Sequence, residues 1–401
     1  MGLFASRRAA RQSSFGQRPA KGRLGRITRK VALALGGTFA LVLAVDACKS
    51  APNLPMLTPA KGWTASAAAP VISAGDHRAQ ALWNDPCVVK NADGTYTMYA
   101  TTSVDKPFAP PILPFRLVSR DGRNWTLASP KPLLQAQGGF TAIETPSVVQ
   151  FRGRWHMFFT GLLPSGAKAP MAIGHALSDD GINWKFDPAL RFSATGNVND
   201  WNGYLIGEPG AVVVGDSLRV YFSAVGARKS GKPPQFQSIG VVESKDGASF
   251  SAQRQVLVPS ARYPGSSGYA GYASPAAAMV GGDLHLYYSV AYFESGANPE
   301  WNQVAIAEAV SAGGTKPFVE TDAPILTLRS TKWATGEILG PAPLAENDKL
   351  SMWFGGHVPR DKLGPLVRAG LKGPDFGIGY ASFPLAAPAA AKPVKKRSSS
   401  Q

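Results

Sequence analysis

Short apolar runs bounded by turn residues fill the chain between residues 84 and 383. The stretch at 83–101, WNDPCVVKNADGTYTMYAT, shows the pattern: an Asp-Pro pair, an apolar run, an Asp-Gly turn and a second run rich in Tyr and Met. Apolar runs of this kind between Gly, Pro, Asn and Asp predict β-strands. The 43 glycines and 33 prolines among 401 residues also indicate many turns, which favours an all-β chain.

The opening of this stretch recurs four times. The five copies are NDPCVV (84–89), ETPSVV (144–149), GEPGAVVV (207–214), ASPAAAMV (273–280) and LGPAPLA (339–345). Their prolines, Pro86, Pro146, Pro209, Pro275 and Pro341, are 60, 63, 66 and 66 residues apart. Internal repetition at a fixed period is the signature of a repeat architecture.

Each repeat predicts four strands. A second strand ends in aromatic residues, and a third is closed in three copies by a Ser-x-Asp-Gly turn (119–122, 178–181, 244–247), before a short fourth strand. Four strands per repeat of this length predict a five-bladed β-propeller with four antiparallel strands per blade. The fifth repeat lacks its outer strand, and APVIS (69–73) resembles the missing piece. We therefore expect an N-terminal strand to complete the last blade and close the ring.

Charge and composition divide the rest of the chain. Residues 1–30 form a basic head with nine Lys/Arg and no acid, and residues 386–401 a basic tail with four; both are expected to be disordered. Removing these thirteen charges from the net +16 leaves +3 for residues 31–390, so the body is not expected to bind nucleic acid. Residues 49–68 predict a flexible linker. The propeller is expected over residues 69–385.

An apolar segment follows the basic head. The run VALALGGTFALVLAV (31–45) is shorter than the roughly 20 residues of a membrane span, and it suits an export signal. Residues 31–48 are either a cleaved signal, with lipidation of Cys48 as one form of it, or an uncleaved membrane anchor. In each case the body is expected outside the cytoplasm, periplasmic, secreted or held at the envelope.

The chain shows no motif for a bound metal or cofactor. No Cys/His cluster has zinc spacing, no Gly-rich phosphate loop follows a strand, and no Gly-x-Ser-x-Gly elbow is present. We expect no metal and no cofactor. Cys87 and Cys48 are the two cysteines, and the sequence leaves open whether they pair. Cys87 lies in a strand pattern typical of an unreactive buried thiol.

Carboxylates stand just before the repeat proline in three blades. Because the first strand of a blade lies innermost, residues at its start surround one mouth of the central channel. The two positions ahead of each proline contain Asp85, Glu144 and Glu208 in the first three repeats, and no acid in the last two. Converging carboxylates raise each other's pKa and suit acid/base work on a glycosidic bond. The alternative for each is a turn cap or a solvated side chain.

With these motifs, the chain resembles the five-bladed propeller glycoside hydrolases of families 43 and 32. WNDPCVV is similar to the Asn-Asp-Pro opening of the family 32 type, and residues 85–101 are similar to family 43. By position, the resemblance implies that Asp85 is the base or nucleophile, Glu144 the tuning residue and Glu208 the acid. The chain departs from the family pattern at two places: Thr145 lies between Glu144 and Pro146, and Glu208 lies directly before Pro209.

Other residues near the predicted mouth are candidates for substrate binding. They are Trp83, Asn84, His175, Trp201, Tyr204, Tyr272 and Ser274. Aromatic rings with a polar edge suit sugar faces, and they suit loop packing equally well.

The sequence therefore predicts an exported, monomeric propeller that cleaves an oligo- or polysaccharide with paired carboxylates. Two alternatives stay open. One is a non-catalytic glycan-binding propeller at the cell envelope. The other is a glycoside phosphorylase that holds phosphate with the basic loops at 228–232 and 360–372.

Overall fold

The computed structural model describes residues 54–73, 82–103, 111–226, 237–263, 268–293, 301–357 and 376–385. The basic head, the apolar segment, Cys48, the tail and the two basic loops lie outside these residues. Among the described residues, no helix is long and apolar enough to cross a membrane.

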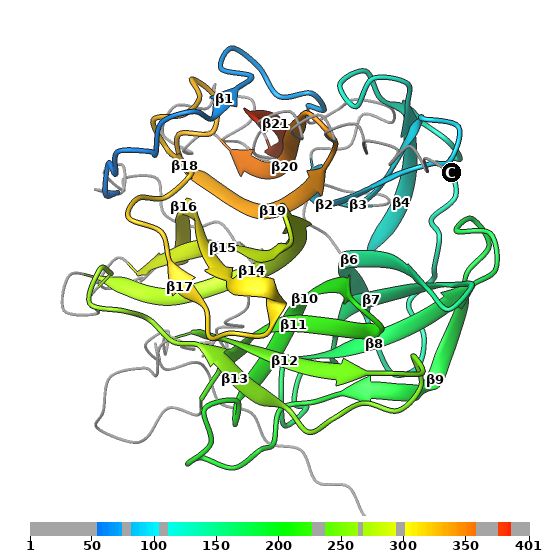
Figure 1. The fold of residues 1–401 in the computed structure, drawn as a ribbon. Helices are drawn as coiled ribbons and strands as arrows, with labels where there is room; N and C mark the ends of the chain where they lie inside the picture. The colour runs from blue at the N-terminus through cyan, green and yellow to red at the C-terminus, as the bar shows by residue number, and fades with distance from the viewer. Residues whose placement is uncertain are drawn as a thin grey trace, which may run out of the picture. The chain divides into compact units, whose positions relative to one another are not determined.

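The described chain is an all-β propeller of five antiparallel blades (Figure 1). The first blade consists of β2 (Asn84–Lys90), β3 (Tyr96–Ser103), β4 (Ile112–Ser119) and β5 (Thr126–Leu127). The second consists of β6 (Ala142–Phe151), β7 (Arg154–Leu162), β8 (Met171–Ser178) and β9 (Lys185–Phe192). The third consists of β10 (Leu205–Val214), β11 (Ser217–Val225), β12 (Ser238–Ser244) and β13 (Arg254–Leu257).

The last two blades follow the same order with local changes. The fourth consists of β14 (Tyr269–Val280), β15 (Asp283–Phe293), β16 (Trp301–Ser311) and β17 (Val319–Glu320), and β18 (Leu326–Thr327) also pairs with β16. The fifth has β19 (Glu337–Ala345), β20 (Lys349–His357) and β21 (Phe376–Pro384), with β1 (Thr64–Ala65) beside β21. The predicted count of five blades is confirmed.

The N-terminal strand of the fifth blade differs from the prediction. The residues paired with β21 are Thr64 and Ala65, which lie within the predicted linker. Within the predicted 69–73 strand, only Ile72 pairs, through an isolated bridge to Ile378. The closure of the ring by this segment stays a prediction.

The proline-bearing strands are innermost, as the repeat predicts. β2 lies against β6, β6 against β10, β10 against β14, β14 against β19, and β19 against β2. These five strands surround the centre of the ring (Figure 1). The second and third strands carry the large apolar residues that pack between blades. Trp353 of β20, for example, packs edge-on against Trp125 of the first blade and donates its indole N–H to the Gly122 carbonyl at 2.8 Å.

The three Ser-x-Asp-Gly turns share one set of hydrogen bonds. In the first, the Ser119 hydroxyl accepts from the N–H of Gly122, and Asp121 Oδ1 accepts from the N–H groups of Arg123 and Asn124. The turns at 178–183 and 244–249 repeat these bonds. Backbone donors around the carboxylate hold the pKa of Asp121 well below its usual range.

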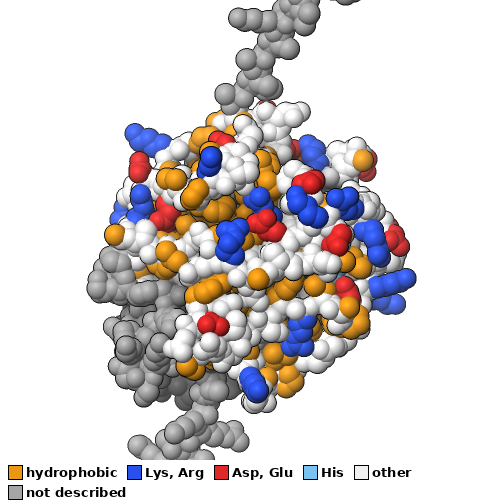
Figure 2. Space-filling view, turned by 60° about the horizontal axis from the view of Figure 1, so that its bottom comes forward, with side chains coloured by type: hydrophobic (Ala, Val, Ile, Leu, Met, Phe, Trp, Pro, Cys, Tyr) orange, Lys and Arg blue, Asp and Glu red, His pale blue; other side chains and the backbone are white. Residues whose placement is uncertain are grey.

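The surface shown in Figure 2 carries both signs of charge. Lys and Arg side chains are interspersed with Asp and Glu over this face and do not gather into one basic patch.

Candidate active site

Each innermost strand has a β-bulge at its repeat proline. The pairing with the second strand shifts between residues 84 and 87, 144 and 147, 207 and 210, 273 and 276, and 339 and 342. Proline cannot donate a ladder hydrogen bond, so it is tolerated at such a bulge. The residue before each proline has a positive φ: Asp85 (52°), Thr145 (48°), Glu208 (53°), Ser274 (48°) and Gly340 (58°). This conformation costs a non-glycine residue about 1–2 kcal/mol.

A hydroxyl from the preceding blade binds the strained residue. The backbone N–H of the residue before proline donates to Thr or Ser at the end of the second strand of the blade before it. These bonds are Thr145 to Thr101 (3.2 Å), Glu208 to Thr160 (2.7 Å), Ser274 to Ser223 (2.8 Å) and Gly340 to Ser289 (3.1 Å). We call this contact the hydroxyl latch. It holds the bulge in place, because a buried N–H without a partner is costly.

The first blade departs from the latch. The equivalent second-strand residue is Gly355, and a Cβ built on it would lie 1.9 Å from Asn84 Oδ1. The Asn84 side chain thus fills the place that a hydroxyl-bearing residue takes elsewhere in the ring.

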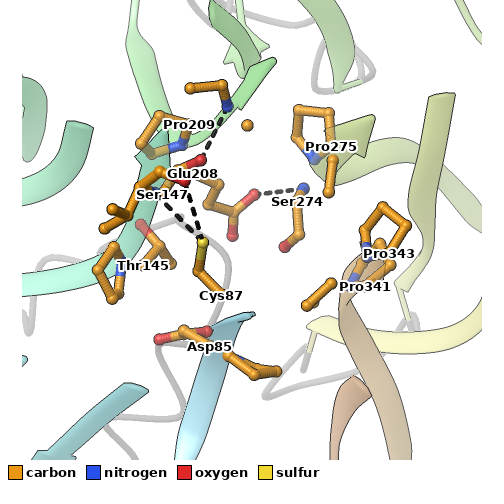
Figure 3. A pocket seen from close by; sticks show the side chains of 18 of the residues that line it. Asp85, Cys87, Thr145, Ser147, Glu208, Pro209, Ser274, Pro275, Pro341 and Pro343 are labelled. Carbon is orange, nitrogen blue, oxygen red and sulfur yellow. Dashed lines mark hydrogen bonds between the residues drawn. The ribbon is translucent and has the colours of Figure 1, made fainter. Parts of the chain in front are cut away.

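A cavity of about 150 Å³ lies between the five innermost strands (Figure 3). All five repeat prolines line it, together with Asp85, Cys87, Thr145, Ser147, Glu208 and Ser274. Asp85 on β2 and Glu208 on β10 therefore line one cavity, although their strands are separated by β6. Glu144 is not among the residues that line it.

Glu208 is held through one of its two carboxyl oxygens. Oε2 accepts from the Ser223 hydroxyl at 2.6 Å and from the Ser274 N–H at 2.8 Å. Oε1 is buried and has no hydrogen-bond partner among the described residues. Burial raises the pKa of Glu208, and the bonds from Ser223 and Ser274 offset part of this rise because they favour the charged form.

The pKa of Glu144 is raised more strongly than that of Glu208. It is buried on β6, and its Oε1 has no partner among the described residues. Burial raises the pKa of Glu144 well above its usual value, and the charges of Asp85 and then Glu208 raise it further. The carboxyl groups of Asp85, Glu144 and Glu208, which the sequence repeat grouped together, are thus close enough to interact electrostatically.

Cys87 lies on the cavity wall as a neutral thiol. Its Sγ accepts from the N–H of Val148 at 3.2 Å, and burial raises its pKa to about 11. At neutral pH it is not a thiolate, so it is a poor nucleophile.

The predicted substrate-binding residues are scattered. Ser274 lines the cavity. Trp83, Asn84 and Tyr272 are fully buried elsewhere: Trp83 packs edge-on against Phe115, and the Tyr272 hydroxyl donates to Glu320. These three side chains pack between strands and do not line the cavity, so their role in binding stays a prediction.

The remaining three candidates also lie away from the cavity wall. His175 is on β8, two strands out from the channel, where its Nδ1 is 2.9 Å from Asp187 and its Nε2 is 3.1 Å from His156. Burial lowers the pKa of His175, so it is neutral at neutral pH. Trp201 is half-buried and stacks on Phe222, and Tyr204 is half-buried in the loop before β10. A role for Trp201 and Tyr204 in binding stays a prediction.

Ser223 is a site residue that the sequence prediction missed. The signal was present: the second strands read YAT, FFT, YFS, YYS and WFG at equivalent places, with a hydroxyl in four of the five. The role of this hydroxyl depends on the β-bulge that it contacts, and the sequence pattern alone did not reveal the bulge.

Solved structures share this fold. A thermostable family-43 glycoside hydrolase is similar with a TM-score of 0.53 and 17% identity, over 78% of this chain and 95% of that one. The catalytic domain of the GH62 α-L-arabinofuranosidase from Coprinopsis cinerea is similar with a TM-score of 0.55 and 12% identity, over 82% and 100%. The β-1,2-mannobiose phosphorylase from Listeria innocua gives 0.51 and 14%, over 82% and 94%. No protein-family model and no curated protein matches the chain in sequence.

Proposed function

We propose that the chain is a glycoside hydrolase that cleaves a glycosidic bond in an oligo- or polysaccharide. The observation that carries this proposal is the pairing of Asp85 and Glu208 on one cavity, with the pKa of Glu208 raised by burial. The fold that the chain shares with glycoside hydrolases supports it. The basic head and apolar segment at 1–45 support export of the same enzyme from the cytoplasm, which fractionation of cells would check.

Glu208 takes the part of the general acid. Burial raises the pKa of Glu208, which favours the protonated form that can protonate the glycosidic oxygen as the bond to the anomeric carbon breaks. Asp85 either attacks that carbon or removes a proton from the water that does, and water then supplies the new hydroxyl group. The proton released from water restores the acid.

Glu144 tunes the pair. Burial and the charges of Asp85 and Glu208 raise the pKa of Glu144, which favours its uncharged form and lessens its repulsion of the negative charge that Asp85 needs.

The test is turnover of aryl glycosides and of plant, fructan and bacterial oligosaccharides by the full-length chain. Asp85→Asn and Glu208→Gln should each lower kcat/KM by roughly 100-fold or more, the usual contribution of an acid or base. Glu243→Gln, which alters a carboxylate on β12 of the same blade as Glu208, is the matched control and should keep full activity. Loss of activity in all three variants, or in none, would contradict the assigned roles.

A glycoside phosphorylase is the second candidate, because one structural neighbour is a mannobiose phosphorylase. It predicts turnover that requires inorganic phosphate and releases a sugar phosphate. Binding of a glycan without turnover under both conditions would identify a carbohydrate-binding propeller.

A further inference from the structure

We propose that Ser223 is a positioning residue that keeps the acid proton of Glu208 on Oε1. This inference rests on the proposed function, because it describes how the assigned acid is held. It starts from one latch hydroxyl that also donates to a carboxylate, which the equivalent hydroxyls of the other blades do not do among the described residues.

Comparison of the four hydroxyl latches distinguishes two contacts: acceptance from a backbone N–H and donation to a carboxylate. Thr101, Thr160 and Ser289 accept from the backbone N–H of the next blade, and no bond from their hydroxyls to a carboxylate is present among the described residues. Ser223 accepts from the Ser274 N–H in the same way, and its hydroxyl also donates to Glu208 Oε2 at 2.6 Å. Ser223 and Glu208 belong to neighbouring strands of one blade, with Ser223 paired opposite Gly207, which brings the hydroxyl within reach.

The direction of these bonds fixes where the proton lies. A hydroxyl has one proton to give, and the lone pairs of Ser223 already face the N–H of Ser274. Glu208 Oε2 faces two donors, the Ser223 hydroxyl and the Ser274 N–H. A proton on Oε2 would point at one of these donors. In the protonated acid the proton is therefore carried by Oε1, the buried oxygen that no described group binds.

Other titratable groups lie near Glu208 on two other innermost strands. They are Asp85 and Cys87 on β2 and Glu144 on β6, and Asp85 and Cys87 share the cavity with Glu208. Because these groups are unchanged in a Ser223 variant, a difference from the wild type reports the Ser223 hydroxyl itself.

The test compares Ser223→Ala with Ser289→Ala, which removes the equivalent latch of the fourth blade, where no carboxylate of the described residues bonds to the hydroxyl. The hydroxyl favours the charged form of Glu208, so its loss should raise the pKa of Glu208. The alkaline limb of kcat/KM should then move to higher pH by about one unit. The proton is also no longer confined to Oε1, so we expect about a 10-fold lower kcat/KM on an alkyl glycoside, whose leaving group needs the acid. For a nitrophenyl glycoside, kcat/KM should fall less than about 3-fold, since its leaving group does not need protonation by the acid.

Three companion results support the assignment. Ser289→Ala should keep the wild-type pH profile. Ser223→Thr should keep it as well, because Thr occupies this place at residues 101 and 160. Ser223→Cys, which preserves the volume with a weaker donor, should behave like Ser223→Ala and serves if the alanine variant does not fold. Identical pH profiles and leaving-group dependence for Ser223→Ala and Ser289→Ala would overturn the inference.

A measurement without substrate separates this inference from the proposed function. Titration of ¹³C-labelled glutamate side chains by NMR, with Glu208 assigned through Glu208→Gln, gives the pKa of Glu208 directly. If the wild type cleaves no glycoside, the proposed function has failed. A higher pKa of Glu208 in Ser223→Ala, with none in Ser289→Ala, would still support the role of the hydroxyl. An unchanged pKa in both variants would overturn it.

Discussion

Replacing Glu144 by glutamine should make the protein more stable at neutral and alkaline pH. Glu144 is buried with an unpartnered oxygen, and burial followed by the charges of Asp85 and Glu208 raises its pKa. In the unfolded chain the same group titrates near pH 4.3. Between these two pKa values the folded protein binds one more proton than the unfolded chain. The contribution of Glu144 to stability is therefore complete below about pH 4.3 and is lost as the pH rises through the folded pKa.

The size of the effect follows from a single proton. One additional bound proton in the folded state lowers the free energy of unfolding by at most about 1.4 kcal/mol for each unit of pH. Glutamine does not titrate, so the free energy of unfolding of Glu144→Gln should exceed that of the wild type by an amount that grows with pH. Glu208→Gln should show the same trend over a narrower range of pH, because Ser223 and Ser274 offset part of the rise in its pKa.

Urea unfolding between pH 5 and pH 8, followed by the fluorescence of the nine tryptophans, measures this difference. The buried His156, whose pKa is lowered to about 4, also makes stability depend on pH, but it contributes equally to both proteins and cancels in the difference. A difference between Glu144→Gln and wild type that is constant over this range would refute the reasoning.

Two further predictions concern the packing between the first and last blades. Gly355→Ser should lower the free energy of unfolding by about 1–3 kcal/mol, because its Cβ would lie 1.9 Å from Asn84 Oδ1. Adding Asn84→Ala should restore most of the lost stability. A double variant no more stable than Gly355→Ser would contradict the contact. Gly122→Ala, with φ 72° and a Cβ 2.9 Å from the Trp353 ring, should lose more stability in thermal unfolding than Gly94→Ala, which has φ 84° and no atom within 4 Å. The Gly94 variant should lose only the roughly 1–2 kcal/mol of left-handed backbone strain, and equal losses would show that the Trp353 contact is unimportant.

The arrangement of blades was predictable because one residue type marks it. Proline is excluded from the middle of a regular ladder, so a proline repeated at the same place in five strands indicates a repeated irregularity in one architecture. The spacing of Pro86 to Pro341 was therefore enough to count the blades and to identify the innermost strands. The short outer strands carry no such mark, which explains why the strand beside β21 was expected at 69–73 and lies at Thr64–Ala65, while the predicted segment contacts β21 only around Ile72.

Which side chains face the channel could not be predicted from the alternation of residues along a regular strand. In a regular strand successive residues face opposite sides. In β2, the four consecutive residues from Asp85 to Val88 all line the cavity, because the bulge interrupts the alternation. The same interruption sends Asn84 and Trp83 into the packing between strands. A carboxylate beside the proline could be recognised from the sequence, but its neighbours could not be assigned to the cavity or the core.

Strain alone does not distinguish the site from the scaffold. Thr145 and Ser274 are as strained as Asp85 and Glu208, while Gly340 shows that the same bulge can form without that cost. What separates the carboxylates is their hydrogen bonding. Glu144 and Glu208 each bury an oxygen without a described partner, at a cost of about 1–3 kcal/mol for each unsatisfied group. The propeller forms the equivalent positions of the fourth and fifth blades without acids, so the fold does not require these groups. Buried carboxyl groups with raised pKa values that the fold does not need are consistent with the acid/base chemistry proposed for the cavity.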